Sequence, residues 1–360
     1  MELSRRDLIV GAAAIAATGG IESSSHAREA PVALKELPAV KRGVATYSYQ
    51  EEVMMGAMDC EAVIREIADI GGYGLELIAE MLVPKFPNPP ARWVDQWHGW
   101  IERYGVKPVA YTQFIDTMRT FTHNLSVDEG VQTMLRDINL AKLLGIPRIR
   151  ALVGTPVEIL EATLPHLEKH DIWLGVEIHY PLRIDSPLVE RLHRIAERHP
   201  HFGFVPDFGI FQNKPSPQAR DLLVRRGAVT REAALYIEDA WSRGETEASV
   251  VDTLGKMSAG PGAANYATTV YRIVPVKPRD LLPIMQYCKH IHGKTWGLDE
   301  ECKDPAIDLS EVIPVLKSGG FDGTIATEYE GQRLVQDIQP LTAVEMVRRH
   351  HVMLRRLLEA

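Results

Sequence analysis

Short apolar runs alternate with longer amphipathic stretches from Lys41 to the end of the chain. The intervening stretches have the period of a helix, and two of them start at Asp59 and Ser126, residue types that cap helix N-termini. Eight runs rich in Val, Ile and Leu predict strands, which end at Ser48, Ile78, Thr112, Leu152, Glu177, Asp207, His292 and Glu328. Eight strands that are each followed by a helix predict an α/β fold, a (β/α)8 TIM barrel over residues 41–360.

The spacing of these runs also predicts a long insertion between strands six and seven. All other steps between strand ends fit one strand plus one helix, whereas the step from Asp207 to His292 covers 85 residues. Most of Lys214 to Pro278 is therefore extra chain. Since the active site of a TIM barrel lies where the strands end, we expect this insertion to cover the site.

The first 27 residues resemble a twin-arginine export signal. "SRRDLI" carries Arg5 and Arg6, a weakly apolar stretch follows, and a small-x-small pattern ends at Ala27. Asp7 and Ile9 depart from the commonest form of the motif, and the apolar run is too short for a spanning helix. The sequence thus predicts an exported, periplasmic protein, with residues 28–40 as a linker.

Charge and cysteine content narrow the function. A formal net charge of −8, without a cluster of Lys and Arg, argues against a nucleic-acid partner and favours a small-molecule substrate. The three cysteines are Cys60, Cys288 and Cys302, an odd number without CxxC spacing, so that no disulfide framework is predicted.

Four strand ends in the second half of the barrel carry candidate metal ligands. Three carboxylates and one imidazole would converge there and the carboxylates would repel one another, a conflict that a divalent cation resolves. These residues are Glu177, Asp207, His292 and Glu328.

Each of these residues also has a structural interpretation. Glu177 would pair with an arginine inside the barrel, Asp207 would cap a turn, and His292 would be an ordinary core histidine. Glu328, with Glu330 two residues later, would belong to a solvated face. For Glu76 and Arg150, at two other strand ends, an ion pair and a substrate contact are equally consistent with the sequence.

The order Glu, Asp, His, Glu on the last four strands resembles the xylose isomerase-like superfamily of sugar isomerases and epimerases. "HIHGK" and "GFDGTIATEYEG" are similar to its last two strand ends. The resemblance implies one divalent metal ion held by the four candidate ligands, most often Mn, with Mg, Co or Zn as alternatives.

Other stretches resemble the large, metal-binding subunit of bacterial C-glycoside deglycosidases, enzymes that open the carbon–carbon bond of 3-oxo-C-glycosides. They are "YSYQEE", "ELIAEM", "FPNPP", "VDQWHGW", "TPVEI", "VEIHYPL" and "PDFGIF". This resemblance implies that His179 is a base, and it leaves a small partner subunit or a homo-oligomer open.

These residue types permit a metal-assisted removal of a proton next to a carbonyl of an oxidised sugar or 3-oxo-glycoside. The candidate catalytic groups are His179, Glu177 and Glu328, and Lys294 and Trp296 are candidate substrate contacts. The outcome would be that of a deglycosidase-like lyase or of an isomerase or epimerase.

Two alternatives stay open. One is a simple ketose isomerase or epimerase, although Ile210 stands where ketose 3-epimerases usually carry a histidine, and no arginine follows His292 closely. The other is an exported sugar-binding or accessory subunit that needs a partner for catalysis.

Overall fold

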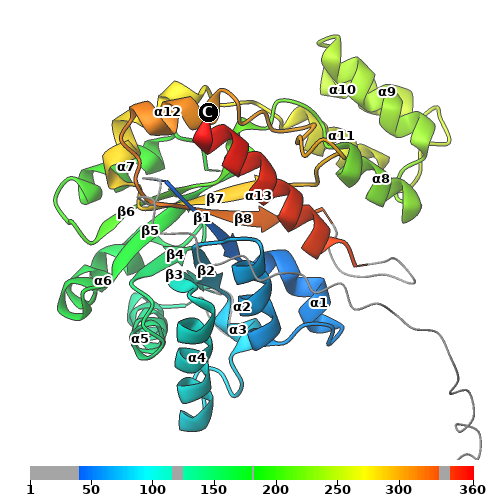
Figure 1. Cartoon of the computed structure of the whole chain (residues 1–360). Coiled ribbons are helices and arrows are strands. Elements are labelled where there is room, and N and C mark those ends of the chain that lie inside the picture. The colour runs from blue at the N-terminus through cyan, green and yellow to red at the C-terminus, as the bar shows by residue number, and fades with distance from the viewer. Residues whose placement is uncertain (1–39, 116–124, 181, 332–340) are drawn as a thin grey trace, which may run out of the picture. The chain divides into compact units, whose positions relative to one another are not determined.

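Eight parallel strands form the centre of the protein (Figure 1). The structure, a computed structural model, describes residues 40–115, 125–180, 182–331 and 341–360. The strands pair in the order β6-β5-β4-β3-β2-β1-β8-β7, and isolated bridges between the β6 and β7 sides nearly close the ring. Their bounds are β1 Lys41–Ala45, β2 Gly74–Leu77, β3 Lys107–Gln113, β4 Arg148–Ala151, β5 Trp173–Ile178, β6 Phe202–Pro206, β7 His290–Thr295 and β8 Thr324–Tyr329. The predicted (β/α)8 barrel is confirmed.

Helices follow the strands around the ring, and two predicted starts are confirmed. The side chain of Asp59 accepts a hydrogen bond from the backbone of Ala62, and Ser126 forms a capping box with Glu129. The helices outside the insertion are α1 Gln50–Met54, α2 Cys60–Asp69, α3 Ala79–Leu82, α4 Ala91–Tyr104, α5 Val127–Leu143, α6 Val157–His170, α7 Pro187–Ala196, α12 Val312–Ser318 and α13 Ala343–Glu359.

The prediction that the first strand ends at Ser48 is wrong. β1 ends at Ala45, and Thr46–Tyr49 form the 3-10 helix η1. The hydroxyl of Thr46 accepts a hydrogen bond from the backbone N–H of Ile78, and that of Ser48 donates to the carbonyl of Thr327. These hydroxyl groups form hydrogen bonds here in place of the backbone hydrogen bonds between paired strands. The strand β1 therefore ends earlier than the apolar pattern indicates.

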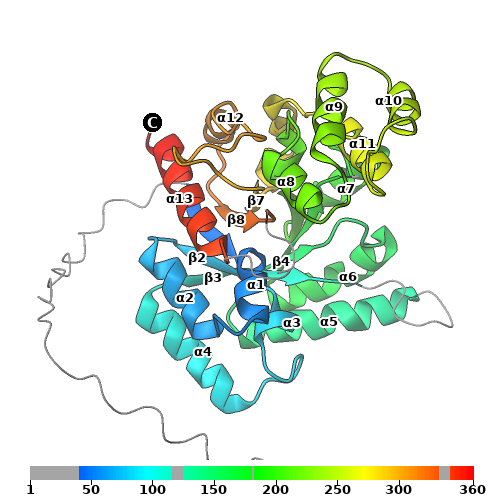
Figure 2. The ribbon, with the colours of Figure 1, turned by 90° about the vertical axis from the view of Figure 1, so that its right-hand side faces the viewer.

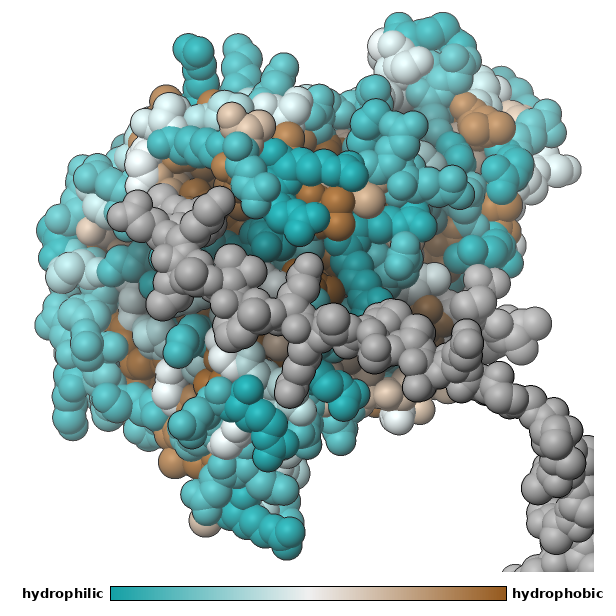
Figure 3. Space-filling model, viewed as in Figure 1, coloured by the Kyte–Doolittle hydropathy of each residue, from teal (hydrophilic) through white to brown (hydrophobic). Residues whose placement is uncertain are grey.

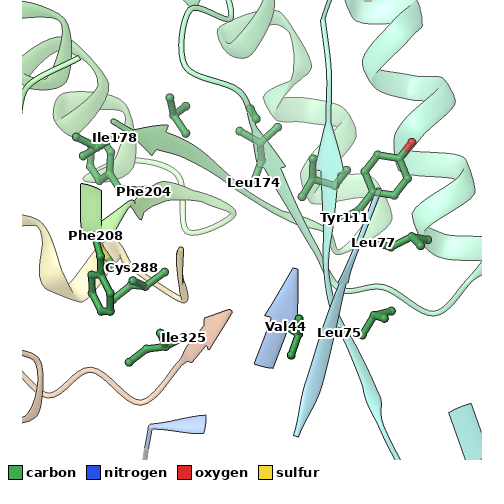
Figure 4. Close-up of a cluster of buried hydrophobic side chains, with 14 of the residues drawn as sticks. Val44, Leu75, Leu77, Tyr111, Leu174, Ile178, Phe204, Phe208, Cys288 and Ile325 are labelled. Carbon is green, nitrogen blue, oxygen red and sulfur yellow. The ribbon is translucent and has the colours of Figure 1, made fainter. Parts of the chain in front are cut away.

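Side chains alternate between the helices and the inside of the barrel. Leu75 and Leu77 of β2 are among the apolar residues in the cluster of Figure 4, and Glu76 between them points to the other face. Alternation thus turns Glu76, the acidic residue of an otherwise apolar strand, inward. On β5, Gly175 leaves room for the side chain of Trp173, whose ring would lie 2.3 Å from a Cβ added at that glycine.

The predicted insertion is present and has its own small core. After the 3-10 helix η2 (Phe208–Phe211), it comprises α8 Pro217–Arg225, α9 Arg231–Ser242, α10 Glu247–Leu254 and α11 Ala263–Tyr271, and a further 3-10 helix, η3 (Pro278–Tyr287), leads into β7. Val229, Ile237 and Val250 are among the buried residues of this core. The four α-helices lie together beyond the carboxyl ends of β7 and β8 (Figures 1 and 2).

The face of the molecule seen in Figure 3 is mostly hydrophilic, with scattered apolar patches. Among the helices of the described ranges, none is both long and apolar enough to cross a membrane. The predicted export signal, residues 1–27, and all of the predicted linker except Val40 lie outside the described residues.

Candidate metal and substrate site

The four candidate ligands come together inside the barrel, on β5, just after β6, on β7 and on β8. The prediction that the seventh strand ends at His292 is wrong, because β7 continues in register with β8 to Thr295. One ligand atom from each of Glu177, Asp207, His292 and Glu328 lies within 4.8 Å of the others, and all four residues are buried. Nδ1 of His292 is 2.8 Å from Oε1 of Glu177, 3.4 Å from Oε1 of Glu328 and 3.9 Å from Oδ2 of Asp207. Asp207 and His292 are also backbone neighbours, joined by an isolated bridge.

The chemistry of this cluster fits a divalent cation. Nε2 of His292 faces the carboxylate of Glu76 at 3.0 and 2.9 Å, so the opposite ring nitrogen, Nδ1, is directed at the other three carboxylates. Nδ1 of His292, Oδ2 of Asp207 and Oε2 of Glu328 are buried and form no hydrogen bond of good geometry with a described residue, although a charged group lies close to each of them. Three carboxylate oxygens and one imidazole nitrogen suit Mn²⁺, Mg²⁺, Co²⁺ or Zn²⁺.

Lys294 is part of this cluster and does not line the cavity beside it. Its Nζ lies 2.8 Å from Oε2 of Glu328, 3.3 Å from Oδ2 of Asp207 and 3.0 Å from Oε1 of Glu330. The side chain is almost fully buried. Its position therefore places a positive charge beside two candidate metal ligands, Asp207 and Glu328.

Arg150 supplies a second buried positive charge. Its NH1 is 3.6 Å from Oε2 of Glu177, and its Nε is 3.8 Å from Oε1 of Glu76. The ion-pair interpretation of Glu76 and Arg150 thus agrees with the structure, and Arg150 also joins Glu76 to one of the candidate ligands.

The acid–base properties of the cluster follow from burial and from these charges. Burial raises the pKa of Asp207 to about 7, against the attraction of Lys294. Burial also acts to raise the pKa of Glu177, but Arg150 and then His292 outweigh it and lower that pKa to about 2. The pKa of His292 is well above its usual value, because Glu328 and Glu76 outweigh the effect of burial. The carboxylates thus raise the proton affinity of His292 and of Asp207, and a cation at the same place would compete with these protons.

His179 is the first residue after β5 and follows Glu177 by two positions, so strand alternation predicts that both side chains lie on the same side. The side chain is half-buried, and its Nδ1 has no hydrogen-bond partner among the described residues. Its sequence neighbours Tyr180 and Leu182 line a cavity, and His179 is close enough to the candidate ligand Asp207 to affect the pKa of that carboxyl.

The cavity has a volume of about 510 Å³ and lies between the barrel and the insertion. Trp296, a predicted substrate contact, is in its wall, and its Nε1 donates to Oε1 of Gln212 at 3.3 Å. Most of the lining is apolar or aromatic: Tyr180, Leu182, Ile210, Tyr271, Ile273, Val274, Val276 and Trp296, with Arg183, Gly209, Gln212, Thr269 and Arg272 completing it.

Two contacts hold the insertion against the barrel loops at this cavity. Arg272 stacks over the ring of Tyr180 at 5.3 Å, and Arg183 donates to the carbonyl of Val274 at 3.3 Å. The cavity wall is thus built from segments that are distant in sequence, since Arg183 and Val274 are 91 residues apart.

Sequence reasoning missed the role of Glu76 and His290. Both are fully buried, and Nε2 of His290 lies 2.7 Å from Oε2 of Glu76. The signal was available, because "GLELI" places Glu76 among apolar strand residues in the same way as "LGVEI" places Glu177. What the sequence lacked was the partner, which comes from the opposite side of the barrel.

Fold and site together define a class of protein. The family model described as the xylose isomerase-like TIM barrel matches residues 64–355, and the chain belongs to this family. Within it, the chain is similar to the C-glycoside deglycosidase alpha subunit of Arthrobacter globiformis, with 26% identity over 331 residues that cover 89% of this chain and 93% of the relative. It is equally similar to the 3'-dehydrocarminate deglycosidase alpha subunit of a Microbacterium species, with 26% identity, 88% of this chain and 94% of the relative.

Solved structures share the fold at low sequence identity. The D-allulose 3-epimerase from a Methylomonas species has a TM-score of 0.54 and 10% identity, and the match covers 88% of this chain and 98% of that one. A sugar phosphate isomerase/epimerase from Parabacteroides distasonis has a TM-score of 0.52 and 13% identity, over 88% of this chain and 93% of that one. At sequence identities this low, the similarity concerns the fold alone.

Proposed function

We propose that this protein is a sugar-active enzyme of the deglycosidase type. It would remove a proton next to the carbonyl of a 3-oxo-glycoside and release the aglycone, with one divalent metal ion, Mn²⁺ as our expectation, at Glu177, Asp207, His292 and Glu328. The relatives named deglycosidase alpha subunits, which match this chain over nearly its whole length, support the proposal.

One observation carries it: the cluster of candidate ligands adjoins a large apolar cavity. Gly209 of the cavity wall follows Asp207 by two residues, and its N–H donates to Oδ1 of Asp207 at 2.6 Å. A free ketose has hydroxyl groups on nearly every carbon and gains little from an apolar wall, whereas the aglycone of a glycoside buries apolar surface there. The cavity therefore favours a glycoside over a free ketose.

The residues suggest how the reaction would proceed. A bound metal ion would polarise the carbonyl of the sugar and stabilise the negative charge that develops on its oxygen. His179 would take the proton from C2, next to the carbonyl at C3. The C1–aglycone bond would then break, its electron pair would leave with the aglycone, and the aglycone atom would be protonated. Tyr180 and Trp296 would hold the aglycone during these steps.

The proposal includes a second subunit. Both relatives are named alpha subunits, which implies a partner protein for each of them. We expect this chain to bind a smaller partner chain, and its activity alone to be lower than that of the assembly. Co-expression with a candidate partner gene and a comparison of turnover with and without it tests this extension.

The function is tested by the choice of substrate. Purified protein loaded with Mn²⁺ is incubated with 3-oxo-glycosides of large and small aglycones and with free ketoses, and aglycone release and epimer formation are followed.

Thr269→Trp, at an exposed position of the cavity wall, should raise KM about tenfold or more for a large aglycone and little for a methyl group. Leu235→Trp, exposed on α9 and outside the cavity wall, is the matched control. Turnover of free ketoses alone would replace the proposal with an epimerase, and no turnover of either by the assembly with its partner chain would favour a binding subunit.

A further inference from the structure

Glu76 connects the candidate ligand His292 to the opposite side of the barrel. It lies on β2, between two outward-facing leucines, and is completely buried. Its carboxylate faces Nε2 of His292 at 3.0 and 2.9 Å and Nε2 of His290 at 2.7 Å. The hydroxyl of Thr112, on β3, donates to Oε1 at 2.7 Å. Groups from two other strands, β3 and β7, thus converge on one carboxylate.

The hydrogen-bonding capacity of Glu76 decides which ring nitrogens carry protons. An ionised carboxylate only accepts hydrogen bonds, and Arg150, with its Nε 3.8 Å from Oε1, favours the ionised form. Both histidines must therefore donate from Nε2. A histidine that binds a metal ion is neutral and has a single N–H, so a proton kept on Nε2 leaves the lone pair of His292 on Nδ1.

Nδ1 of His292 is the atom that faces the three other candidate ligands, at 2.8 Å from Glu177 and 3.4 Å from Glu328. The opposite tautomer would direct an N–H at the ion and a lone pair at Glu76, which is repulsive at both ends. Metal-ligating histidines commonly donate their other N–H to a carboxylate, and removal of such a partner typically weakens metal binding 10- to 100-fold.

We propose that Glu76 is a positioning residue, which selects the Nε2–H tautomer of His292 and so presents Nδ1 to a metal ion. His290 supports it with a contact to Oε2, one of the two carboxylate oxygens that Nε2 of His292 faces. This inference rests on the metal site of the proposed function, but not on the reaction, since metal binding and ring protonation are measured without substrate.

A second metal ion between Glu76, His290 and His292 is the competing interpretation, since these three also bring potential ligand atoms close together. The separations of 2.7 to 3.0 Å between ring nitrogen and carboxylate oxygen are those of N–H···O hydrogen bonds. We therefore expect one ion per chain, and a stoichiometry of two would overturn the assignment.

Glu76→Gln tests the proposal with little change of shape. An amide has one acceptor oxygen and one donor nitrogen, so that one of the two histidines loses its acceptor. We expect the Kd for Mn²⁺, measured by calorimetry on the metal-free full chain, to rise 10- to 100-fold, with full occupancy restored at high Mn²⁺. Thr112→Val removes another donor to the same carboxylate and should change Kd less than about threefold. An unchanged Kd in Glu76→Gln would overturn the proposal.

Nitrogen NMR of the unsubstituted protein shows which ring nitrogen of His292 carries the proton, a property that does not depend on any effect of Glu76 on folding. With ¹⁵N-labelled histidine and Zn²⁺ as a diamagnetic probe, the resonances missing from His292→Asn identify this ring. We expect its Nε2 to carry the proton and its Nδ1 to show the shift of a metal ligand. Zinc on Nε2, with the proton on Nδ1, would refute the proposal even if Glu76→Gln fails to fold.

Discussion

Lys294 and Glu328 face each other on neighbouring strands, in register, with Nζ 2.8 Å from Oε2. Glu328 is a candidate metal ligand, so the ammonium group lies where it repels a cation bound to that carboxylate. Lys294 therefore lowers the affinity of the site for a cation, and the contact with substrate that the sequence predicts would be its role in the reaction.

Lys294→Met should therefore strengthen metal binding and weaken catalysis. Two unit charges 4 Å apart interact by about 4 kcal/mol at an effective dielectric constant of 20, and retention of about a third of that energy amounts to tenfold in affinity. We expect the Kd for Mn²⁺ to fall at least about tenfold in calorimetry, while turnover of a 3-oxo-glycoside decreases. Weaker metal binding would mean that Lys294 holds the carboxylates in place for the ion.

Single replacement of any candidate ligand by alanine should remove most of the bound metal. This applies to Glu177, Asp207, His292 and Glu328, because loss of one donor leaves the remaining buried charges with an incomplete coordination shell. Metal content is measured by mass spectrometry after exhaustive dialysis.

Glu330→Ala is the control for this series. Its carboxylate contacts Lys294 at 3.0 Å and lies just after the end of β8, so that we expect nearly full metal content. If two of the four alanine variants still bound one ion per chain, the assignment of the metal site would be refuted.

His179→Asn should separate proton removal from metal binding. The side chain is not among the candidate ligands, so the ion should stay bound, whereas exchange of the C2 proton of a 3-oxo-glycoside with deuterated water should slow at least about 100-fold. Exchange is followed by proton NMR under conditions in which the aglycone is retained. Undiminished exchange would assign the base to Glu177 or Glu328 and favour the epimerase mechanism.

Stability should fall below pH 6.5 because α13 buries two neutral histidines. Burial lowers the pKa of His350 and of His351 to about 3, so that the unfolded chain, with ordinary values near 6.5, binds more protons between these limits. Stability is therefore fully present above pH 6.5 and is lost as the pH falls toward 3, by about 2 kcal/mol for each histidine at pH 5.

Urea unfolding between pH 7.5 and 5 measures this effect. His350→Gln should reduce the pH slope of the unfolding free energy by up to about 1.4 kcal/mol per pH unit, the contribution of one proton. Met353→Leu, on the same helix, changes packing without a titratable group and should leave the slope as it is. Equal slopes in all three proteins would contradict the assignment of neutral buried histidines.

For the export signal we propose that Arg5 and Arg6 direct transport through the twin-arginine route. Arg5→Lys together with Arg6→Lys should retain the protein in the cytoplasm, because this route requires the arginine pair. Fractionation of cells that express the full chain, with an antibody to the mature protein, compares the two forms. Equal release into the periplasm would leave the segment without the proposed role.

The barrel and the meeting of four candidate ligands could be predicted from the sequence because both depend on local patterns. Strand ends follow from apolar runs, and the TIM-barrel fold brings the ends of parallel strands to one face, so that Glu177 and His292 were expected to be neighbours. The insertion followed from the length of one step between strands.

Contacts across the barrel could not be predicted in this way. The pairing of Glu76 with two histidines depends on which side chains reach the barrel axis at the same height, and Lys294 was expected in the cavity wall and not among carboxylates. Residue spacing gives the face of a strand on which a side chain lies, but not the reach of a flexible side chain or the level of its partner.

The seam between β6 and β7 has a mechanical consequence for the ring of strands. Isolated bridges, Phe204 to Cys288 and Asp207 to His292, join the two sides there, in contrast to the continuous ladders of the other neighbours. Asp207 and His292 are also candidate ligands on opposite sides of this seam. An ion held by both would link β6 to β7 by coordination, at the place in the ring of strands where backbone hydrogen bonds are sparse.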